Sequence, residues 1–309
     1  MTLLKQPVMV PLALQEISPE TFNKARKFLE PGDVAAHSYL DQAELAAIDA
    51  GGLPNLYNGT SVTGRPRAVG VHLVHMPRRV RRVLLQDTGW WDYDIRSCHI
   101  SIFLALASYH GIRLARLARY SKNKDYAHAR WSEAVGGNIG PNAFKAPTLA
   151  LVTGGRNSPF IHRQYLGYRA ADQWVRRPFV RRMYTEIRAG HDAILKNGAA
   201  STDDSTGSSI AVTNAVGRTQ TGVTRTQAIA HLFTGLEQYA MRYFMTRLSD
   251  SGSLVATIYD GWISRERLAD ELVRRLERGL VRKSTKELGY GLRLKLKCTP
   301  FEPIEPLHQ

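Results

Sequence analysis

Asp94 and Asp260 each follow an apolar stretch of the chain, and carboxylates in that setting can bind a metal ion. The stretches WWDYDI (90–95) and LVATIYD (254–260) have the alternation or the β-branched residues of strands, which predicts each aspartate at a strand end. Two carboxylates brought together repel each other unless a cation lies between them, and Mg²⁺ prefers oxygen ligands. The pair therefore predicts a divalent-metal site of the two-ion type that catalyses phosphoryl transfer.

Two alternatives stay open for single residues of this kind. Asp-Gly is a common hairpin turn, so Asp260 taken alone fits a turn residue equally well. Lys145 begins a segment, KAPTLALV, in which Lys145, Thr148 or Leu149, and Val152 would share a helix face; Pro147 fits that helix only in its first turn. An ammonium placed there could neutralise a triphosphate, although a single lysine on an amphipathic helix is more often simply solvated.

The elements that must position these residues can be placed by pattern. Residues 90–95 read as a strand that turns into an apolar helix from Ile100, and 254–264 reads as a β-hairpin with its turn at Asp260-Gly261. Residues 111–198 are mostly helical in pattern and basic, and 224–248 reads as one long helix. The remaining expectations are helix in 17–48, loop in 51–64, an exposed connector or mobile hairpin in 199–217, helix in 269–287 and a strand near 292–298.

Composition limits the class of protein. The 309 residues are 43% hydrophobic and 22% charged, enough for a real core, and 42 Lys and Arg against 27 Asp and Glu give a net charge of +15. Such an excess predicts a polyanionic partner, with nucleic acid the leading candidate. Cys98 and Cys298 belong to no zinc or disulfide pattern, and no apolar run reaches the roughly 18 residues of a spanning helix. We therefore expect an intracellular protein that is neither secreted nor bound to a membrane.

Three segments, in this order, resemble the palm and fingers motifs of the family A DNA polymerases and the single-subunit phage-type RNA polymerases. DYDIRSCHISIFLALA (92–107) is similar to the strand and helix with the first metal-binding aspartate, Asp94. FKAPTLALVTGG (144–155) matches the fingers motif at Lys145 and Gly154, and LVATIYDGWIS (254–264) is similar to the third motif, with Asp260. The resemblance implies an α+β fold, with a right-hand polymerase-like palm, a small antiparallel sheet backed by helices, and a helical fingers insertion.

Two weaker similarities add nucleic-acid-binding residues. GRPRAVGVHLVHMPRRVRR (64–82) resembles a segment upstream of the first motif in divergent, compact phage and plasmid polymerase-like proteins, and TQAIAHLFTGLEQYAM (226–241) resembles a helix whose polar residues face the primer and the cleft. The residues they imply as contacts for template or primer are Arg65, Arg67, Arg78, Arg81, His231 and Glu237.

The sequence departs from the family pattern at several positions. Thr153 replaces the aromatic residue of the fingers motif, and Pro141 stands where an arginine is usual, so Arg156 or Arg130 is expected to supply that charge. Gly261 replaces an acidic residue, which leaves two carboxylates for metal. His99 lies where the DNA polymerases carry a sugar-sensing glutamate, and its ring can exclude a 2′-hydroxyl or hydrogen-bond to it.

The resemblance implies a template-directed nucleotidyltransferase that adds nucleotides to a 3′-hydroxyl with Mg²⁺ or Mn²⁺, and the bulk of His99 favours a DNA product. Asp94 and Asp260 would be catalytic and, with the Ile95 carbonyl, would bind metal. Lys145 would also be catalytic, because it would contact the triphosphate and protonate the leaving pyrophosphate. The residues implied as further contacts for the nucleoside triphosphate are His99, Thr153, Gly154 and Arg156. The implied domains are an N-terminal clamp or short thumb (1–63), palm (64–110 and 224–309) and fingers (111–223), with no proofreading nuclease. So compact an enzyme is expected to need an accessory replication protein for processivity. A metal-dependent nuclease, or a non-catalytic nucleic-acid-binding protein on a degenerate polymerase fold, is the alternative.

Overall fold

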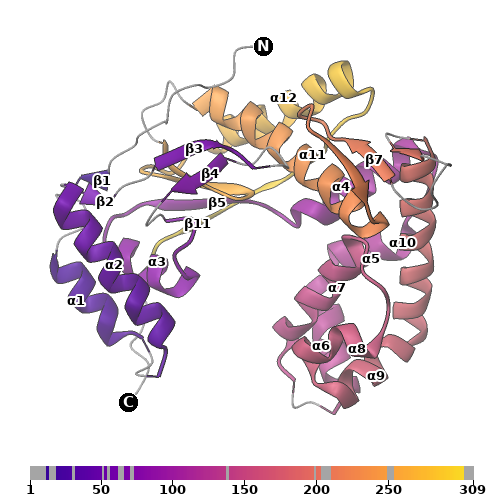
Figure 1. Ribbon diagram of the computed structural model, residues 1–309, viewed down its shortest axis with the longest axis horizontal. Coiled ribbons are helices and arrows are strands. Elements are labelled where there is room, and N and C mark those ends of the chain that lie inside the picture. The colour runs from indigo at the N-terminus through magenta and orange to yellow at the C-terminus, as the bar shows by residue number, and fades with distance from the viewer. Residues whose placement is uncertain are drawn as a thin grey trace. The chain divides into compact units, whose positions relative to one another are not determined.

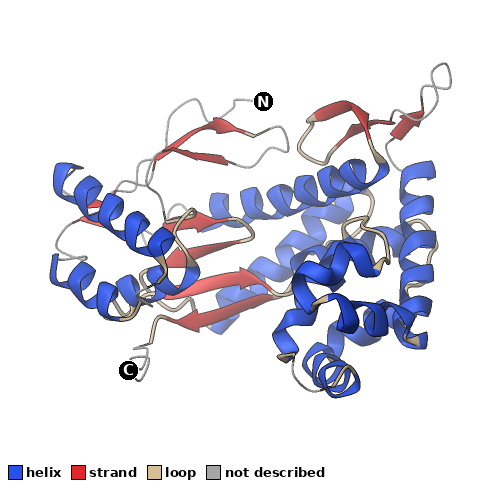
Figure 2. Cartoon of the chain, turned by 60° about the horizontal axis from the view of Figure 1, so that its bottom comes forward, coloured by secondary structure: helices blue, strands red, loops and turns tan. Residues whose placement is uncertain are grey.

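The computed structural model describes residues 12–13, 19–29, 32–50, 52–53, 56–61, 66–69, 73–136, 139–197, 200–202, 210–248 and 254–302. The chain forms two compact units. The first unit comprises residues 1–95, 241–276 and 295–309, and the second comprises 96–240 and 277–294. Helices dominate and short antiparallel strands accompany them, so the fold belongs to the α+β class, as expected from the sequence (Figures 1 and 2).

A four-stranded sheet is the centre of the first unit. Its strands are β5 (Trp91–Ile95), β9 (Leu254–Ile258), β10 (Gly261–Ser264) and β11 (Leu296–Pro300), in the order β11-β5-β10-β9. Every neighbouring pair is antiparallel. The strands expected at 90–95 and in the hairpin are confirmed, and the last strand begins a few residues later than its pattern indicated. The strand that carries Asp94 therefore lies in the middle of the sheet, beside the hairpin that carries Asp260.

The N-terminal helices share a hydrophobic core with this sheet. They are α1 (Pro19–Lys27), α2 (Val34–Ala50) and α3 (Arg78–Leu85) (Figure 1). Phe22, Leu40 and Val80 are fully buried in one cluster with Ile258 and Ile263 of the hairpin. The buried residues of α2 recur at helical spacing and form one face of that helix: Ala36, Leu40, Ala43 and Ala47. Residues 51–64, expected to be loop, contain two short strands: β2 (Gly52–Leu53) pairs with β1 (Leu12–Ala13), and β3 (Leu56–Thr60) pairs with β4 (Pro66–Val69).

Aromatic packing fixes β5 against β10. The Tyr93 and Trp262 rings stack with centroids 5.1 Å apart, and Phe244 of α11 (Arg225–Leu248) lies 5.6 Å from Trp262. The hydroxyl of Tyr93 accepts a hydrogen bond from the backbone N–H of Leu268 at 2.6 Å, just before α12 (Asp270–Leu288). Trp262 is fully buried. This packing holds the strand that carries Asp94 against the hairpin that carries Asp260.

The second unit is largely helical, as predicted for residues 111–198. Its helices are α4 (Cys98–Tyr109), α5 (Ala115–Lys122), α6 (Lys124–Ala134), the 3₁₀ helix η1 (Pro141–Phe144), α7 (Lys145–Val152), α8 (Pro159–Leu166), α9 (Tyr168–Arg176) and α10 (Pro178–Asn197). The strands β6 (Ala200–Thr202), β7 (Ile210–Thr213) and β8 (Thr219–Val223) form a small antiparallel sheet. The rings of Trp131, Phe144 and Trp174 pack together in the aromatic core of the second unit. Within the described residues, no helix has both the length and the apolar character needed to cross a bilayer.

His191 of α10 is a buried titratable group in this unit. Its side chain is 1% exposed, its ring stacks on Phe103 at 4.7 Å, and its Nε2 donates to the Val152 carbonyl at 2.8 Å. Burial lowers the pKa of His191 from 6.5 to about 4, because the charged imidazolium would lose its hydration. The folded protein therefore holds this histidine neutral.

This placement predicts a loss of stability in acid. The unfolded chain binds a proton at His191 below a pKa of about 6.5 and the folded chain only near 4, so stability falls as the pH drops between these values. The loss should approach about 3 kcal/mol. His191→Gln keeps a donor but cannot titrate, so urea unfolding at pH 7 and pH 4 should show a smaller acid loss for the variant. Equal losses in both proteins would contradict the prediction.

Candidate active site

The sheet register brings Asp94, on β5, next to Asp260, in the turn that leads into β10. Asp94 is the fourth residue of β5 and pairs with Gly261, the first residue of β10. The backbone N–H of Ile95 donates to the Asp260 carbonyl at 3.0 Å, so the two aspartates lie one residue apart across the strand pair. The Asp94 side chain is exposed and the Asp260 side chain is half-buried. Two segments 166 positions apart in sequence thus present carboxylates at the same end of one sheet.

The turn of the hairpin differs from the expected one. Ile258 pairs with Gly261, so the two turn residues are Tyr259 and Asp260, and the expected Asp260-Gly261 turn is wrong by one residue. Tyr259 adopts a positive φ of 47° and is 50% exposed. Asp260 therefore lies in the turn itself, and Gly261 belongs to the strand.

Gly261 is required by the close approach of β5. A Cβ at this position would lie 2.1 Å from the Tyr93 carbonyl oxygen and 3.2 Å from the Asp94 Cα. Any side chain would force the two strands apart, because neither contact partner is the end of a flexible side chain. Glycine is therefore the residue that lets the Asp94 strand approach the hairpin, and an acidic side chain would not fit at this position.

Unfavourable backbone conformations occur close to both aspartates. Among the described residues, only Ser97 (φ 50°) and Tyr259 (φ 47°) are non-glycine residues with a positive φ. Ser97 follows Asp94 by three positions, and Tyr259 immediately precedes Asp260. Such conformations cost about 1–3 kcal/mol each and are concentrated at functional sites. Each of these two positions therefore lies close in sequence to one of the two carboxylates.

Lys297 is a neighbour of Asp94 that the sequence analysis missed. It pairs with Asp94 on the other side of β5, so the two side chains share a face of the sheet, and both are exposed. The alternation in LRLKLK (292–297) is the signal that could have identified it, because that pattern places Arg293, Lys295 and Lys297 on one face of an extended segment.

The carboxylate pair suits a hard divalent cation. No group of three or more His, Cys, Asp or Glu residues able to hold a metal occurs in the part of the chain that the structure describes. Mg²⁺ does not need such a cage, because it keeps several waters and is commonly bound through one or two carboxylates together with substrate phosphates. An exposed carboxylate on β5 and a half-buried one in the neighbouring turn, with the Ile95 carbonyl next to Asp94 in sequence, are a donor set of this type.

His99 and Glu237 form a pair within the second unit. The His99 Nε2 lies 3.0 Å from Glu237 Oε2, and the Gln238 side-chain amide donates to Glu237 Oε1 at 3.0 Å. The Glu237 side chain is 2% exposed, whereas that of His99 is 18% exposed. The carboxylate therefore orients the imidazole, which is the more accessible member of the pair.

The segment that resembles the fingers motif forms α7 and the turn after it. Lys145 and Leu149 lie on the exposed face of α7, whereas Thr148 and Val152 are fully buried, so Leu149 and not Thr148 shares the lysine's face. The Thr153 hydroxyl donates to the Leu149 carbonyl at 3.0 Å, and Arg156 is exposed.

Gly154 joins this turn to the start of α11. Its φ is +101°, and an added Cβ would lie 2.9 Å from the Thr226 Cα. The Thr226 hydroxyl donates to the Gly154 carbonyl at 2.9 Å. Glycine is needed here both for the positive φ and for the close contact, so the end of α7 is held against the first turn of α11.

Some of the residues expected to contact template or primer are buried, and others lie outside the described residues. Arg81 is 8% exposed and donates from Nη1 to the Leu73 carbonyl at 3.0 Å, and His231 is 1% exposed with Nε2 2.8 Å from the Arg218 carbonyl. The structure therefore gives both a contact to the protein's own backbone. Arg65 lies outside the described residues, as do the side chains of Arg67 in β4 and Arg78 in α3.

Comparison with solved structures identifies a protein with a similar fold. No family model matches the sequence, and no curated protein matches it. Among solved structures, the chain is similar to the POL domain of Pol1 from M. smegmatis in complex with DNA primer-template and dNTP, with a TM-score of 0.56 and 14% sequence identity. The match covers 86% of this chain and 50% of that one, so the chain spans about half the length of the structure it matches. The protein therefore has a polymerase-like fold.

Proposed function

We propose that this protein is a template-directed nucleic-acid polymerase that adds nucleotides to a 3′-hydroxyl, with Asp94 and Asp260 as its catalytic carboxylates. The observation that carries the proposal is the register of β5 against β10, which puts Asp94 on β5 one residue away from Asp260 in the turn that leads into β10. The similarity of the fold to that of a solved polymerase domain also supports the proposal. In this proposal residues 64–110 and 224–309 form the palm, 111–223 the fingers and 1–63 a clamp or short thumb.

Asp94 and Asp260, with the Ile95 carbonyl, would hold Mg²⁺ or Mn²⁺. A bound divalent ion lowers the pKa of a primer 3′-hydroxyl and neutralises charge on the phosphates of a nucleoside triphosphate. The exposed position of Asp94 lets it reach substrate, and Gly261 keeps its strand close enough to the hairpin for the two carboxylates to act together.

The exposed end of α7 would bind the nucleoside triphosphate. Lys145 would contact its phosphates and protonate the leaving pyrophosphate, and Arg156 would add positive charge at the other end of the helix. Thr153 and Gly154 form the turn between them, which Thr226 holds through its hydrogen bond to Gly154. All four residues belong to the second unit.

The His99–Glu237 pair would sense the sugar of the incoming nucleotide. His99 follows Asp94 by five residues in the sequence, and Glu237 holds its ring within the second unit, so the aromatic group that would meet the sugar is fixed in orientation. A ring in a fixed position leaves less room for a 2′-hydroxyl, which favours deoxynucleotides and a DNA product.

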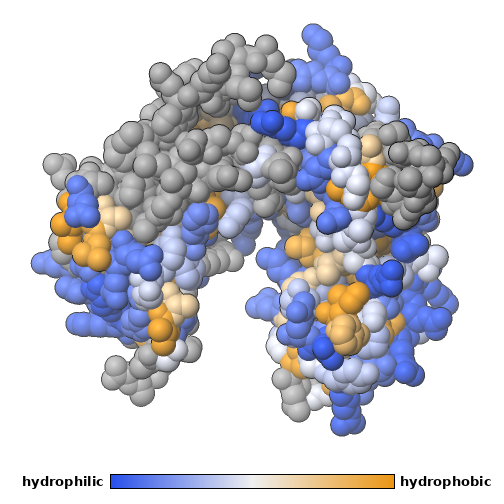
Figure 3. All heavy atoms as spheres, in the orientation of Figure 1, coloured by the Kyte–Doolittle hydropathy of each residue, from blue (hydrophilic) through white to orange (hydrophobic). Residues whose placement is uncertain are grey.

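Nucleic acid is the proposed partner on the grounds of charge. The net charge of +15 favours binding to phosphates without regard to sequence, with an affinity that falls as salt rises. Hydrophilic residues cover much of the described surface visible in Figure 3, over helices of both units. We keep three arginines as proposed contacts for template or primer: Arg65, Arg67 and Arg78. An accessory replication protein is proposed to keep the enzyme on its template.

Extension of a labelled primer tests the proposal. The full chain is incubated with DNA or RNA templates, dNTPs or NTPs, and Mg²⁺ or a chelator. We expect products that are longer than the primer by one or more nucleotides, and we expect the chelator to abolish them. Extension should be faster with dNTPs than with NTPs. Shorter fragments would show a nuclease, and binding without any new product would show a non-catalytic binding protein; either result overturns the proposal.

Lys145→Ala should lower kcat/KM for the incoming nucleotide. A charge-assisted hydrogen bond contributes about 1.5–3 kcal/mol, so the expected loss is about 10- to 100-fold. Lys122→Ala is the matched control, because Lys122 is also an exposed lysine of the second unit but lies on α5. Single-nucleotide incorporation at varied dNTP concentration gives kcat/KM for each variant. Equal values of kcat/KM in the two variants would show that Lys145 does not contact the triphosphate.

A further inference from the structure

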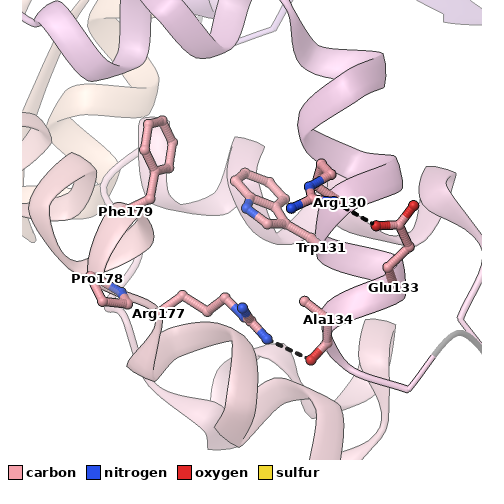
Figure 4. Close-up of a pocket in the computed structure, with 7 residues that line it drawn as sticks. All are labelled: Arg130, Trp131, Glu133, Ala134, Arg177, Pro178 and Phe179. Atoms are coloured by element: carbon pink, nitrogen blue, oxygen red, sulfur yellow. Dashed lines mark hydrogen bonds and ion pairs between the residues drawn. The ribbon is translucent and has the colours of Figure 1, made fainter.

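Two surface hollows meet at Phe179, the second residue of α10. One, of about 400 Å³, is lined by Arg130 and Trp131 of α6 and by Arg177 before α10 (Figure 4). The other, of about 420 Å³, is lined by Arg116 and Arg119 of α5 and by Arg182 of α10. Phe179 belongs to both hollows. Both lie wholly within the second unit, and none of these residues has a role in the catalysis proposed above beyond the charge expected of Arg130.

Arginines make up three of the five residues that line the second hollow and two of the seven that line the first, which Glu133 also lines. Several of the arginine N–H groups are uncommitted. Arg116 is paired with Glu186 at 2.6 Å and Arg130 with Glu133 at 3.2 Å. Arg119 and Arg182 are exposed, and no carboxylate among the described residues pairs with either.

Arg177 is held in place but incompletely satisfied. Its Nη2 donates to the Ala134 carbonyl at 2.5 Å, as Figure 4 shows, whereas its Nε is buried and has no hydrogen-bond partner. A guanidinium does not lose its proton at any ordinary pH, so Arg177 keeps a fixed positive charge at this surface.

Aromatic rings accompany the arginines. Phe179 is half-buried, and its ring centroid lies 6.3 Å from that of Trp131 across the first hollow (Figure 4). Planar guanidinium groups bind phosphate oxygens in pairs, and an accessible ring stacks on an unpaired base of any kind. An acidic peptide would satisfy the charges but would have no use for the rings, and a duplex would keep its base faces away from them.

We propose that the arginine-lined surface around Phe179 binds an unpaired strand of nucleic acid, with phosphates on Arg119, Arg177 and Arg182 and a base against Phe179. This contact goes beyond the proposed polymerase activity, because it requires no chemistry and uses neither aspartate. The surface around Phe179 would thus bind single-stranded nucleic acid through residues other than the catalytic ones.

Fluorescence anisotropy with a labelled oligo-dT strand, measured over a series of salt concentrations, tests the proposal. Arg119→Ala/Arg182→Ala should weaken binding about tenfold and reduce the slope of log K against log salt by about 1.4, which is 0.7 per lost phosphate contact. The control is Arg275→Ala/Arg282→Ala, which removes two exposed arginines from α12 and so changes the net charge equally. Phe179→Leu should keep the salt slope and weaken binding about fivefold.

Equal losses in the two double variants would overturn the proposal, because only net charge would then matter. Tighter binding of poly-glutamate than of oligo-dT, lost in Arg119→Ala/Arg182→Ala, would also overturn it in favour of an acidic protein partner. Asp94→Asn separates this proposal from the polymerase proposal: the variant should bind oligo-dT as tightly as the wild type. Failed primer extension with intact site-specific oligo-dT binding would reject the polymerase alone.

Discussion

Asp94→Asn and Asp260→Asn should each lower the rate of nucleotide incorporation by about a thousandfold, while primer–template affinity changes by less than about threefold. Asparagine keeps the size of the side chain but removes the charge that attracts a divalent cation, and the loss corresponds to about 4 kcal/mol of transition-state stabilisation. Single-turnover incorporation gives the rate, and anisotropy with labelled primer–template gives the affinity. The effect should be similar for the two residues, because the register makes them members of one pair.

Asp92→Asn is the matched control for this prediction. Asp92 lies on the same strand and the same face as Asp94, but two residues further from the turn, where it pairs with Ile263 and Thr299. Its substitution removes the same charge from the same strand and should change incorporation by less than about fivefold. A loss at Asp92 as large as that at Asp94 would show that the charge of the strand matters and the position does not.

Gly261→Ala should reduce both stability and activity. The new methyl group would lie 2.1 Å from the Tyr93 carbonyl oxygen, and backbone atoms on both strands must move to relieve the contact. Overpacking of this kind typically costs about 1–3 kcal/mol, and displacement of Asp94 relative to Asp260 should lower incorporation at least about a hundredfold. Urea unfolding measures the first effect, and primer extension at temperatures where the variant stays folded measures the second.

Gly32→Ala provides the comparison for that variant. Gly32 lies in the same unit, in the turn before α2, and an added Cβ would meet nothing within 4 Å. It should therefore unfold and extend primers much like the wild type. If Gly261→Ala behaves in the same way, then the close approach of β5 is not what holds the two aspartates together.

The strands at 91–95 and 254–258 and the helix at 225–248 were predictable because each has a strong local pattern. The position of the hairpin turn was not, because it depends on Tyr259 adopting a positive φ that a bulky side chain disfavours. The short strands within 51–64 were missed for a related reason: their Gly, Pro and Asn residues favour turns, and pairing with β1 and β4 overrides that preference.

For the candidate site, sequence spacing identified both aspartates but not their neighbours. The pairing of His99 with Glu237 joins residues 138 positions apart, and no local pattern predicts it. Arg81 and His231 are polar residues in basic or amphipathic segments, and only tertiary packing shows that they are buried. The arginines around Phe179 come from α5, α6 and α10, so the surface they form exists only in the folded chain.

Binding of Mn²⁺, followed by the paramagnetic resonance signal of the free ion, tests the central claim most directly. That claim is that Asp94 and Asp260 hold a divalent cation together. The wild type and Asp92→Asn should bind Mn²⁺ alike, and Asp94→Asn and Asp260→Asn should each bind at least about tenfold more weakly, because each removes one of two charged ligands. Equal binding by the wild type and both of these variants would contradict the account.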